Sequence, residues 1–100
     1  MNVLHEADKL VHGDRHTDYG HPLDDFECVA AAMTAFLRRR GKLAPGASLD
    51  YLDHVLWMQC VKMSRECYWP KVDNRVDGAG YWETLQMCVE KLHDDARKGA

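Results

Sequence analysis

The chain has 100 residues and a mass of 11.5 kDa, with 13 Lys and Arg against 16 Asp and Glu and a formal net charge of -3. Hydrophobic residues make up 46% and charged residues 29%, a globular composition that excludes a disordered chain, and the length fits one domain. A pI near 6.0 argues against a protein that coats nucleic acid or a membrane surface, and no apolar run approaches the roughly 18–20 residues that span a bilayer.

The hydrophobic periodicity predicts four helices and no strand. Gly13 is typical of a helix C-terminus, Pro22 suits the first turn of a helix, and Ser48 is a good N-cap. Short connections favour antiparallel neighbours, so we expect an all-α single domain over residues 1–100, built like a four-helix bundle, with a polar tail that frays from about residue 94. The predicted helices cover residues 2–12, 22–40, 48–67 and 77–97.

The third predicted helix carries apolar residues on two sides. Its main stripe consists of residues spaced three or four apart, namely Leu52, Val55, Leu56, Cys60 and Met63. The far side carries three more, namely Trp57, Met58 and Val61. An isolated domain of this kind does not expose so much apolar surface, so the helix is either central or part of a subunit interface.

The start of the chain lacks the basic and apolar regions of a secretory signal, which favours a cytoplasmic protein. The cysteines have no paired zinc spacing, and we expect reduced thiols that mostly serve as small core residues. They are Cys28, Cys60, Cys67 and Cys88.

Asp77 lies on the side of the last predicted helix that should face the core, together with Tyr81 and Leu85. Burying an unpaired carboxylate costs several kcal/mol, so Asp77 needs a partner, a metal ion or water, unless it is an N-cap at a wet bundle end. Asp73 precedes it by four residues. If the helix begins early, both carboxylates point the same way and suit a divalent cation; if it begins late, Asp73 and Asn74 form a turn.

Two further charged pairs are present, and the two members of each pair lie on one face of a predicted helix. Lys62 and Arg65, three residues apart, form either a clamp for phosphate oxygens or a solvated pair. Asp24 and Glu27 have the same spacing, and they either hold a metal ion from one face or decorate a helix N-terminus. The residue types fit a phosphorylated ligand with a bound cation.

The polar loop over residues 13–20 combines glycines with Arg15, which can reach a phosphate, and Tyr19, which can stack on a base. It lacks the Gly-Lys-Ser/Thr end of a phosphate-binding loop. The spacing of His12, His16 and His21 permits a transition-metal site, although no helix aligns them. The alternative is an ordinary polar loop.

Three segments together resemble a family of small phage-encoded domains of uncertain function. They are residues 12–26 (HGDR, then DYGHP, ending at Phe26), Asp53 with residues 62–66 (KMSRE), and residues 71–81 (KVDNRVDGAGY). The chain is similar to the nucleotide-modification-associated domains and, more distantly, to the MazG-type all-α nucleoside triphosphate pyrophosphohydrolases. The resemblance covers residues 6–89. It implies an oligomeric helical bundle in which acidic pairs bind Mg²⁺, and the ions bridge substrate phosphates and assist water attack between the α and β phosphorus atoms.

Carried over onto this chain, the resemblance makes Asp24 and Glu27 a shortened counterpart of the first acidic pair of that group, with Asp25 as a third acid. Asp73 and Asp77 stand for the second pair but are four residues apart, which departs from the pattern. The hypothesis thus assigns Mg²⁺ to Asp24, Glu27, Asp73 and Asp77, with Asp24, Glu27 and Asp77 as catalytic residues. It assigns phosphates to Lys62, Arg65 and Arg15, and the base or sugar to Asn74, Tyr19 and Tyr81.

Together with the charged residues, the resemblance implies an Mg²⁺-dependent nucleotide-binding protein that acts as a homo-oligomer in the cytoplasm of an infected bacterium, without a nucleic-acid polymer or a membrane as partner. Its activity would be that of a (d)NTP pyrophosphohydrolase. Two alternatives remain open: a non-catalytic protein that sequesters a nucleotide, and a helical interaction module that presents Trp57, Met58 and Val61 to a partner.

Overall fold

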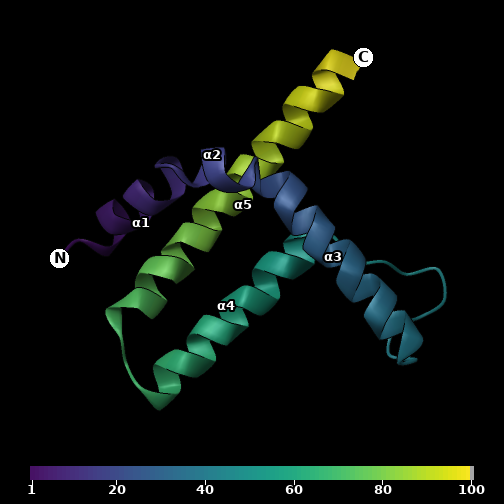
Figure 1. The fold of residues 1–100 in the computed structure, drawn as a ribbon, viewed down its shortest axis with the longest axis horizontal. Coiled ribbons are helices and arrows are strands. Elements are labelled where there is room, and N and C mark those ends of the chain that lie inside the picture. The colour runs from purple at the N-terminus through teal and green to yellow at the C-terminus, as the bar shows by residue number, and fades with distance from the viewer. Residues whose placement is uncertain (100) are drawn as a thin grey trace.

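A computed structural model describes residues 1–99, including every side chain except those of His16 and Thr17. Within this range every regular element is a helix, which confirms the all-α class. Five helices follow one another, one more than predicted, because Arg15–Tyr19 forms a short helix in the polar loop (Figure 1). They are α1 (Val3–His12), α2 (Arg15–Tyr19), α3 (Pro22–Arg39), α4 (Tyr51–Tyr68) and α5 (Val72–Gly99).

Local side chains fix where the helices begin. Gly13 follows α1 and Pro22 opens α3, as predicted. The prediction that Ser48 caps the next helix is wrong, because Asp50 and Asp53 form a capping box that starts α4 at Tyr51. The Asp50 carboxylate accepts from the N–H groups of Leu52 (3.0 Å) and Asp53 (3.2 Å), and the Asp53 carboxylate accepts from the Asp50 N–H at 2.9 Å.

The last helix begins five residues earlier than predicted. The Glu66 carboxylate, near the end of α4, accepts from the N–H of Lys71 at 2.8 Å and from the amide of Asn74 at 3.1 Å. These two hydrogen bonds hold the α4–α5 connection against the first turn of α5. Because α5 begins at Val72, Asp77 lies inside the helix and is not its N-cap. At the other end α5 continues to Gly99, and its last turns form a projecting arm (Figure 1).

Helix α5 is central: α1 and α4 pack along it, and α3 contacts both α4 and α5. The helices spread into a flat array with Cα extents of 45 × 39 × 20 Å (Figure 1). The core cluster contains Leu23, Phe26, Val55 and Cys88, with partly buried Tyr51, Tyr81 and Leu85 against it.

Two predictions about the core are wrong. Most cysteines are not core residues, because Cys28, Cys60 and Cys67 are exposed and only Cys88 among the four is buried; all are free thiols. The main stripe predicted for α4 does not form its buried face either. Of its five residues Val55 alone is buried, and Leu52, Leu56, Cys60 and Met63 are exposed.

Polar side chains explain why α4 buries a different side from the one predicted. Its buried positions are His54, Val55 and Gln59. The Gln59 amide donates a hydrogen bond of 2.8 Å to the carbonyl of Gly78 on α5, so the α4–α5 contact satisfies a buried polar group that periodicity alone would place outside. Among the described helices, none combines the length and apolar character that a membrane span needs.

Candidate functional site

A cavity of about 250 Å³ lies where the first three helices meet α4 and α5. Its apolar wall includes Leu10 and Val11 of α1, Phe26 of α3 and Val76 of α5. Its polar wall consists of Arg15, Tyr19, Asp25, Lys62, Asp77, Tyr81 and Thr84. Five of the residues predicted to bind a ligand thus meet at one place: Arg15, Tyr19, Lys62, Asp77 and Tyr81.

The central feature of this wall is an ion pair between α4 and α5. The Lys62 ammonium lies 2.9 Å from the Asp77 carboxylate, and the two side chains are 15% and 34% exposed. Asp77 therefore has the partner that its position on the inner stripe requires. Lys62 is one turn from Gln59, and Asp77 is next to Gly78, so the buried amide–carbonyl bond holds the ion pair in register.

Gly78 permits this close approach of the two helices. A Cβ atom added at this position would lie 3.3 Å from the Gln59 side-chain oxygen, tighter than an ordinary van der Waals contact. A larger residue there would displace Gln59 and with it the register of Lys62 against Asp77.

The short helix α2 brings the loop residues to the cavity. The Arg15 guanidinium lies over the Tyr19 ring, 5.8 Å from its centroid, in a cation–π contact. Tyr19 is largely exposed, and both its ring and the guanidinium line the cavity.

An aromatic cluster lies behind the cavity wall. The His54 ring centroid lies 4.5 Å from that of Phe26 and 6.5 Å from that of Tyr81, and both of these neighbours line the cavity. His54 is buried, and its Nδ1 atom has no hydrogen-bond partner among the described residues. Burial lowers the pKa of His54, and the charge of Asp25 opposes this shift in part. The imidazole therefore favours the neutral form.

The remaining predicted acids lie elsewhere. Asp24 and Glu27 are exposed on α3 and do not line the cavity. Their charges act on the buried Cys88 thiol: burial first, then Glu27 and Asp24, raise the pKa of Cys88 to about 11. The structure thus places Asp24 and Glu27 on a different side of α3 from Asp25, which does line the cavity.

The residues around the start of α5 stabilise the connection from α4. Asp73 is exposed and pairs with Lys71 at 3.7 Å. Asn74 donates to Glu66, which also pairs with Arg75, and these bonds lower the pKa of the Glu66 carboxyl. Arg65 is exposed and does not line the cavity, so it does not join Lys62 there. Among the described residues, no group of three or more His, Cys, Asp or Glu has an arrangement that could hold a metal ion.

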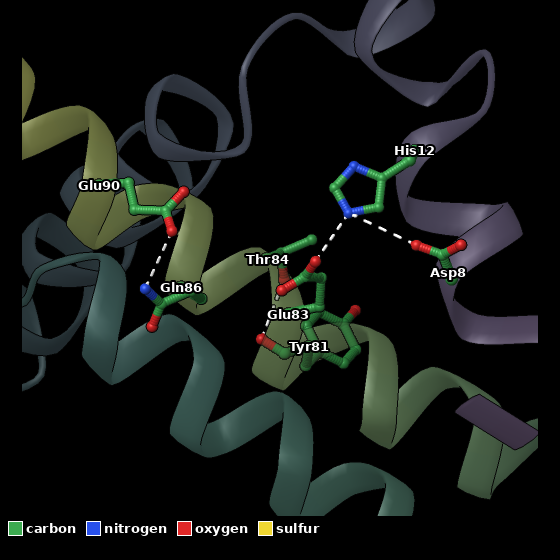
Figure 2. A network of polar contacts seen from close by, with 7 residues as sticks. All are labelled: Asp8, His12, Tyr81, Glu83, Thr84, Gln86 and Glu90. Atoms are coloured by element: carbon green, nitrogen blue, oxygen red, sulfur yellow. Dashed lines mark hydrogen bonds and ion pairs between the residues drawn. The ribbon is translucent and has the colours of Figure 1, made fainter. Parts of the chain in front are cut away.

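The described loop histidines have structural contacts. His12 joins α1 to α5 through Glu83, at 2.7 Å, with Asp8 at 3.9 Å from the same ring nitrogen (Figure 2). His21 caps α3 by accepting from the N–H of Leu23 at 3.1 Å. The side chain of His16 lies outside the described residues.

Sequence reasoning missed the place of Asp25 and Thr84 in the cavity. Asp25 is the third acid beside Asp24, and its face of α3 meets residues of the other four helices at the cavity. Thr84 follows Tyr81 by one turn, and its hydroxyl donates to the Tyr81 carbonyl at 3.0 Å (Figure 2). The helical spacing of 77, 81 and 84 is the one signal in the sequence that marks Thr84.

Comparison with known protein families identifies the family of this chain. The model of a domain of unknown function, DUF6378, matches residues 2–89. This chain belongs to the DUF6378 family. The gene 55 protein of Mycobacterium phage D29 is 26% identical to it over 98 residues. That alignment covers 98% of this chain and 58% of the phage protein, so the chain spans little more than half of its relative. No solved structure matches the DUF6378 chain.

Proposed function

We propose that the cavity of this DUF6378 domain binds a phosphorylated nucleotide. The observation that carries the proposal is the Lys62–Asp77 ion pair, which lies in the wall of a cavity that also contains Arg15, Tyr19 and Tyr81. Cations bind phosphate oxygens, aromatic rings stack on a base, and an apolar wall with a few polar groups is typical of a small-molecule site.

The size and charge of the cavity define how such a ligand would lie. At about 250 Å³ the cavity is smaller than the roughly 300–1,000 Å³ of usual ligand pockets, so it would enclose one part of a nucleotide and leave the rest outside. The ring of Tyr19 would stack on the base at the mouth, and Lys62 and Arg15 would contact phosphate oxygens.

Mg²⁺ is the cofactor that this proposal includes. Arg15 and Lys62 are balanced by Asp25 and Asp77, so the wall has no excess of positive charge for a polyphosphate. A magnesium ion held by one or two carboxylates together with substrate phosphates would supply it. Within the proposal the carboxylates are Asp77 and Asp25, because Asp24 and Glu27 do not line the cavity and Asp73 pairs with Lys71.

The activity proposed for the site is MazG-like hydrolysis of a nucleoside triphosphate between its α and β phosphorus atoms. When bound, the metal would neutralise phosphate charge. The chain's own contribution would be positioning: Lys62 fixes Asp77, and Asp77 or Asp25 orients a water molecule.

A non-catalytic nucleotide-binding protein is the second candidate. The specific observation in its favour is that Asp77 already pairs with Lys62 at 2.9 Å, which engages the carboxylate that catalysis would require. Such a protein would bind the nucleotide through the same cations and rings, with no dependence on a metal.

The test is incubation of the protein with a panel of NTPs and dNTPs with and without Mg²⁺, in which pyrophosphate release and calorimetric binding are both measured. Metal-dependent release supports the enzyme, and binding without release supports the second candidate. Lys62→Met should weaken either by at least tenfold. Lys91→Met is the matched control, because Lys91 pairs with Asp95 outside the cavity. No binding and no release from any nucleotide would contradict both candidates and favour an interaction module.

A further inference from the structure

The outer side of α4 carries an apolar stripe that the described chain leaves partly uncovered. It is defined by Leu52, Leu56, Cys60, Met63 and Cys67, spaced four, four, three and four residues apart. This spacing keeps the five side chains on one side of a helix. Leu52, Leu56 and Met63 are 39%, 46% and 61% exposed, and both cysteines are exposed.

We propose that a second copy of this chain packs against the outer stripe of α4. The spacing of three and four residues is that of a seam between two packed helices. None of the five positions carries a charge, whereas Lys62 and Glu66 lie on other sides of the same helix. A partner of opposite charge would gain nothing from such a surface. A copy of the same stripe matches it, since a two-fold interface joins one patch to itself.

The surface area and the radius of gyration of the chain both exceed those of a compact monomer of this mass. The chain exposes 7143 Å², whereas a compact monomer of 11.5 kDa exposes about 5,800 Å². The excess of about 1,300 Å² belongs to the whole chain, the projecting end of α5 included, and a standard interface buries roughly 800 Å² of each partner. The radius of gyration is 15.3 Å, against about 13 Å for a compact domain of 100 residues.

The stripe and the cavity are separate features. Lys62 contributes to the cavity from the buried side of α4, and none of the five stripe residues lines it. The inference therefore does not rest on the proposed function, and a variant of the stripe leaves the cavity residues in place.

Leu56→Glu tests the inference, because it places a carboxylate in the middle of the stripe. Sedimentation equilibrium of the wild-type protein should give twice the chain mass of 11.5 kDa. Leu56→Glu should give the single chain mass with an unchanged helical circular dichroism spectrum. The matched control is Leu4→Glu, at a 73% exposed leucine of α1 outside the stripe, which should stay dimeric. A wild-type protein of single chain mass at about 100 μM, or a Leu56→Glu variant that remains dimeric, would overturn the inference.

Thiol labelling gives a second measurement on the unmodified chain. The rate of maleimide addition to Cys60, followed by peptide mass spectrometry, should fall at least fivefold as the protein concentration rises through the dimerisation range. Cys28 is an exposed thiol on α3 outside the stripe and serves as the internal control, with a constant rate. Equal concentration dependence at Cys28 and Cys60, or none at either, would contradict a dimer through the stripe.

Discussion

The two sides of helix α4 reverse the usual arrangement of polar and apolar residues. The side toward α5 buries His54 and Gln59 and directs Lys62 to the cavity, with Val55 as its fully buried aliphatic residue. The outer side presents leucines, a methionine and cysteines to solvent. Buried polar groups are costly unless satisfied, and exposed apolar stripes are uncommon in monomers. The comparison teaches that stability alone does not explain either side; in the two proposals above, the inner side contributes to a ligand site and the outer side to an interface.

The largest expected change in the stability of the chain itself comes from the inner side. Val55 is fully buried in the core cluster, so Val55→Ala removes two methyl groups from a packed site. We expect the free energy of unfolding to fall by about 2 kcal/mol at every protein concentration, from lost burial plus the cavity left behind. Urea denaturation at two protein concentrations measures this free energy. Leu4→Ala, at an exposed leucine, should change stability by less than about 0.5 kcal/mol. Equal effects would contradict the assignment of the core.

The outer side should contribute to stability in a different way. Leu52→Ala removes a stripe residue, so its effect on the thermal midpoint should depend on protein concentration, as association stabilises the folded chain by mass action. The decrease in the thermal midpoint should be clear at high protein concentration. It should vanish when the protein is diluted below the dissociation constant of the dimer. A loss of the same size at all concentrations would place Leu52 in the core of the monomer and weaken the comparison.

The pH dependence of stability should identify the buried histidine. Because burial lowers the pKa of His54, the unfolded chain takes up a proton near pH 6.5 while the folded chain resists it. The free energy of unfolding should therefore be highest above pH 6.5 and fall as the pH drops toward the folded pKa. His54→Phe should reduce this fall, whereas the control His93→Gln, at an exposed position of α5, should retain it. An unchanged pH profile in His54→Phe would contradict a buried neutral imidazole.

The smallest effect on stability is expected at the ion pair of the cavity. Asp77→Asn keeps the size of the side chain and leaves Lys62 without its partner, and the carboxylate is about one third exposed. We expect the free energy of unfolding to fall by about 1 kcal/mol, at the upper end of the range for exposed pairs, because the Lys62 ammonium left without its partner is only 15% exposed. If the Mg²⁺-dependent form of the proposed function is right, nucleotide affinity in the presence of Mg²⁺ should nevertheless fall at least tenfold in calorimetry, whereas a metal-independent binding protein should keep its affinity. A large loss of stability with unchanged affinity would make the pair structural.

The fold class and several helix ends could be predicted because they depend on local chemistry. Gly13 and Pro22 act within one turn, and periodicity identifies helices without knowledge of their neighbours. The outward stripe of α4 could not be recognised from periodicity, because an apolar stripe looks the same whether the chain itself or a partner covers it. The capping box at Asp50 was missed because Ser48 is an equally good capping residue when read alone.

The candidate site could be predicted in part. Helical spacing predicts that Asp77 and Tyr81 share the inner face of one helix. The carboxylate on that face requires a partner, and Lys62 is the cation that provides it. The choice of Asp25 over Asp24 depends on which side of α3 faces the cavity, and this follows from the packing of the other helices, which the sequence does not reveal. Asn74 has a ligand-like residue type, yet its partner Glu66 is on another helix and its role is structural.

The most direct test of the central claim, that the cavity binds a nucleotide, is an amide NMR titration of the protein with a dNTP and Mg²⁺. The account predicts the largest chemical-shift changes at Tyr19, Lys62, Asp77 and Tyr81, with the outer stripe of α4 unaffected. Saturable changes confined to other residues, or no change at millimolar nucleotide, would contradict it.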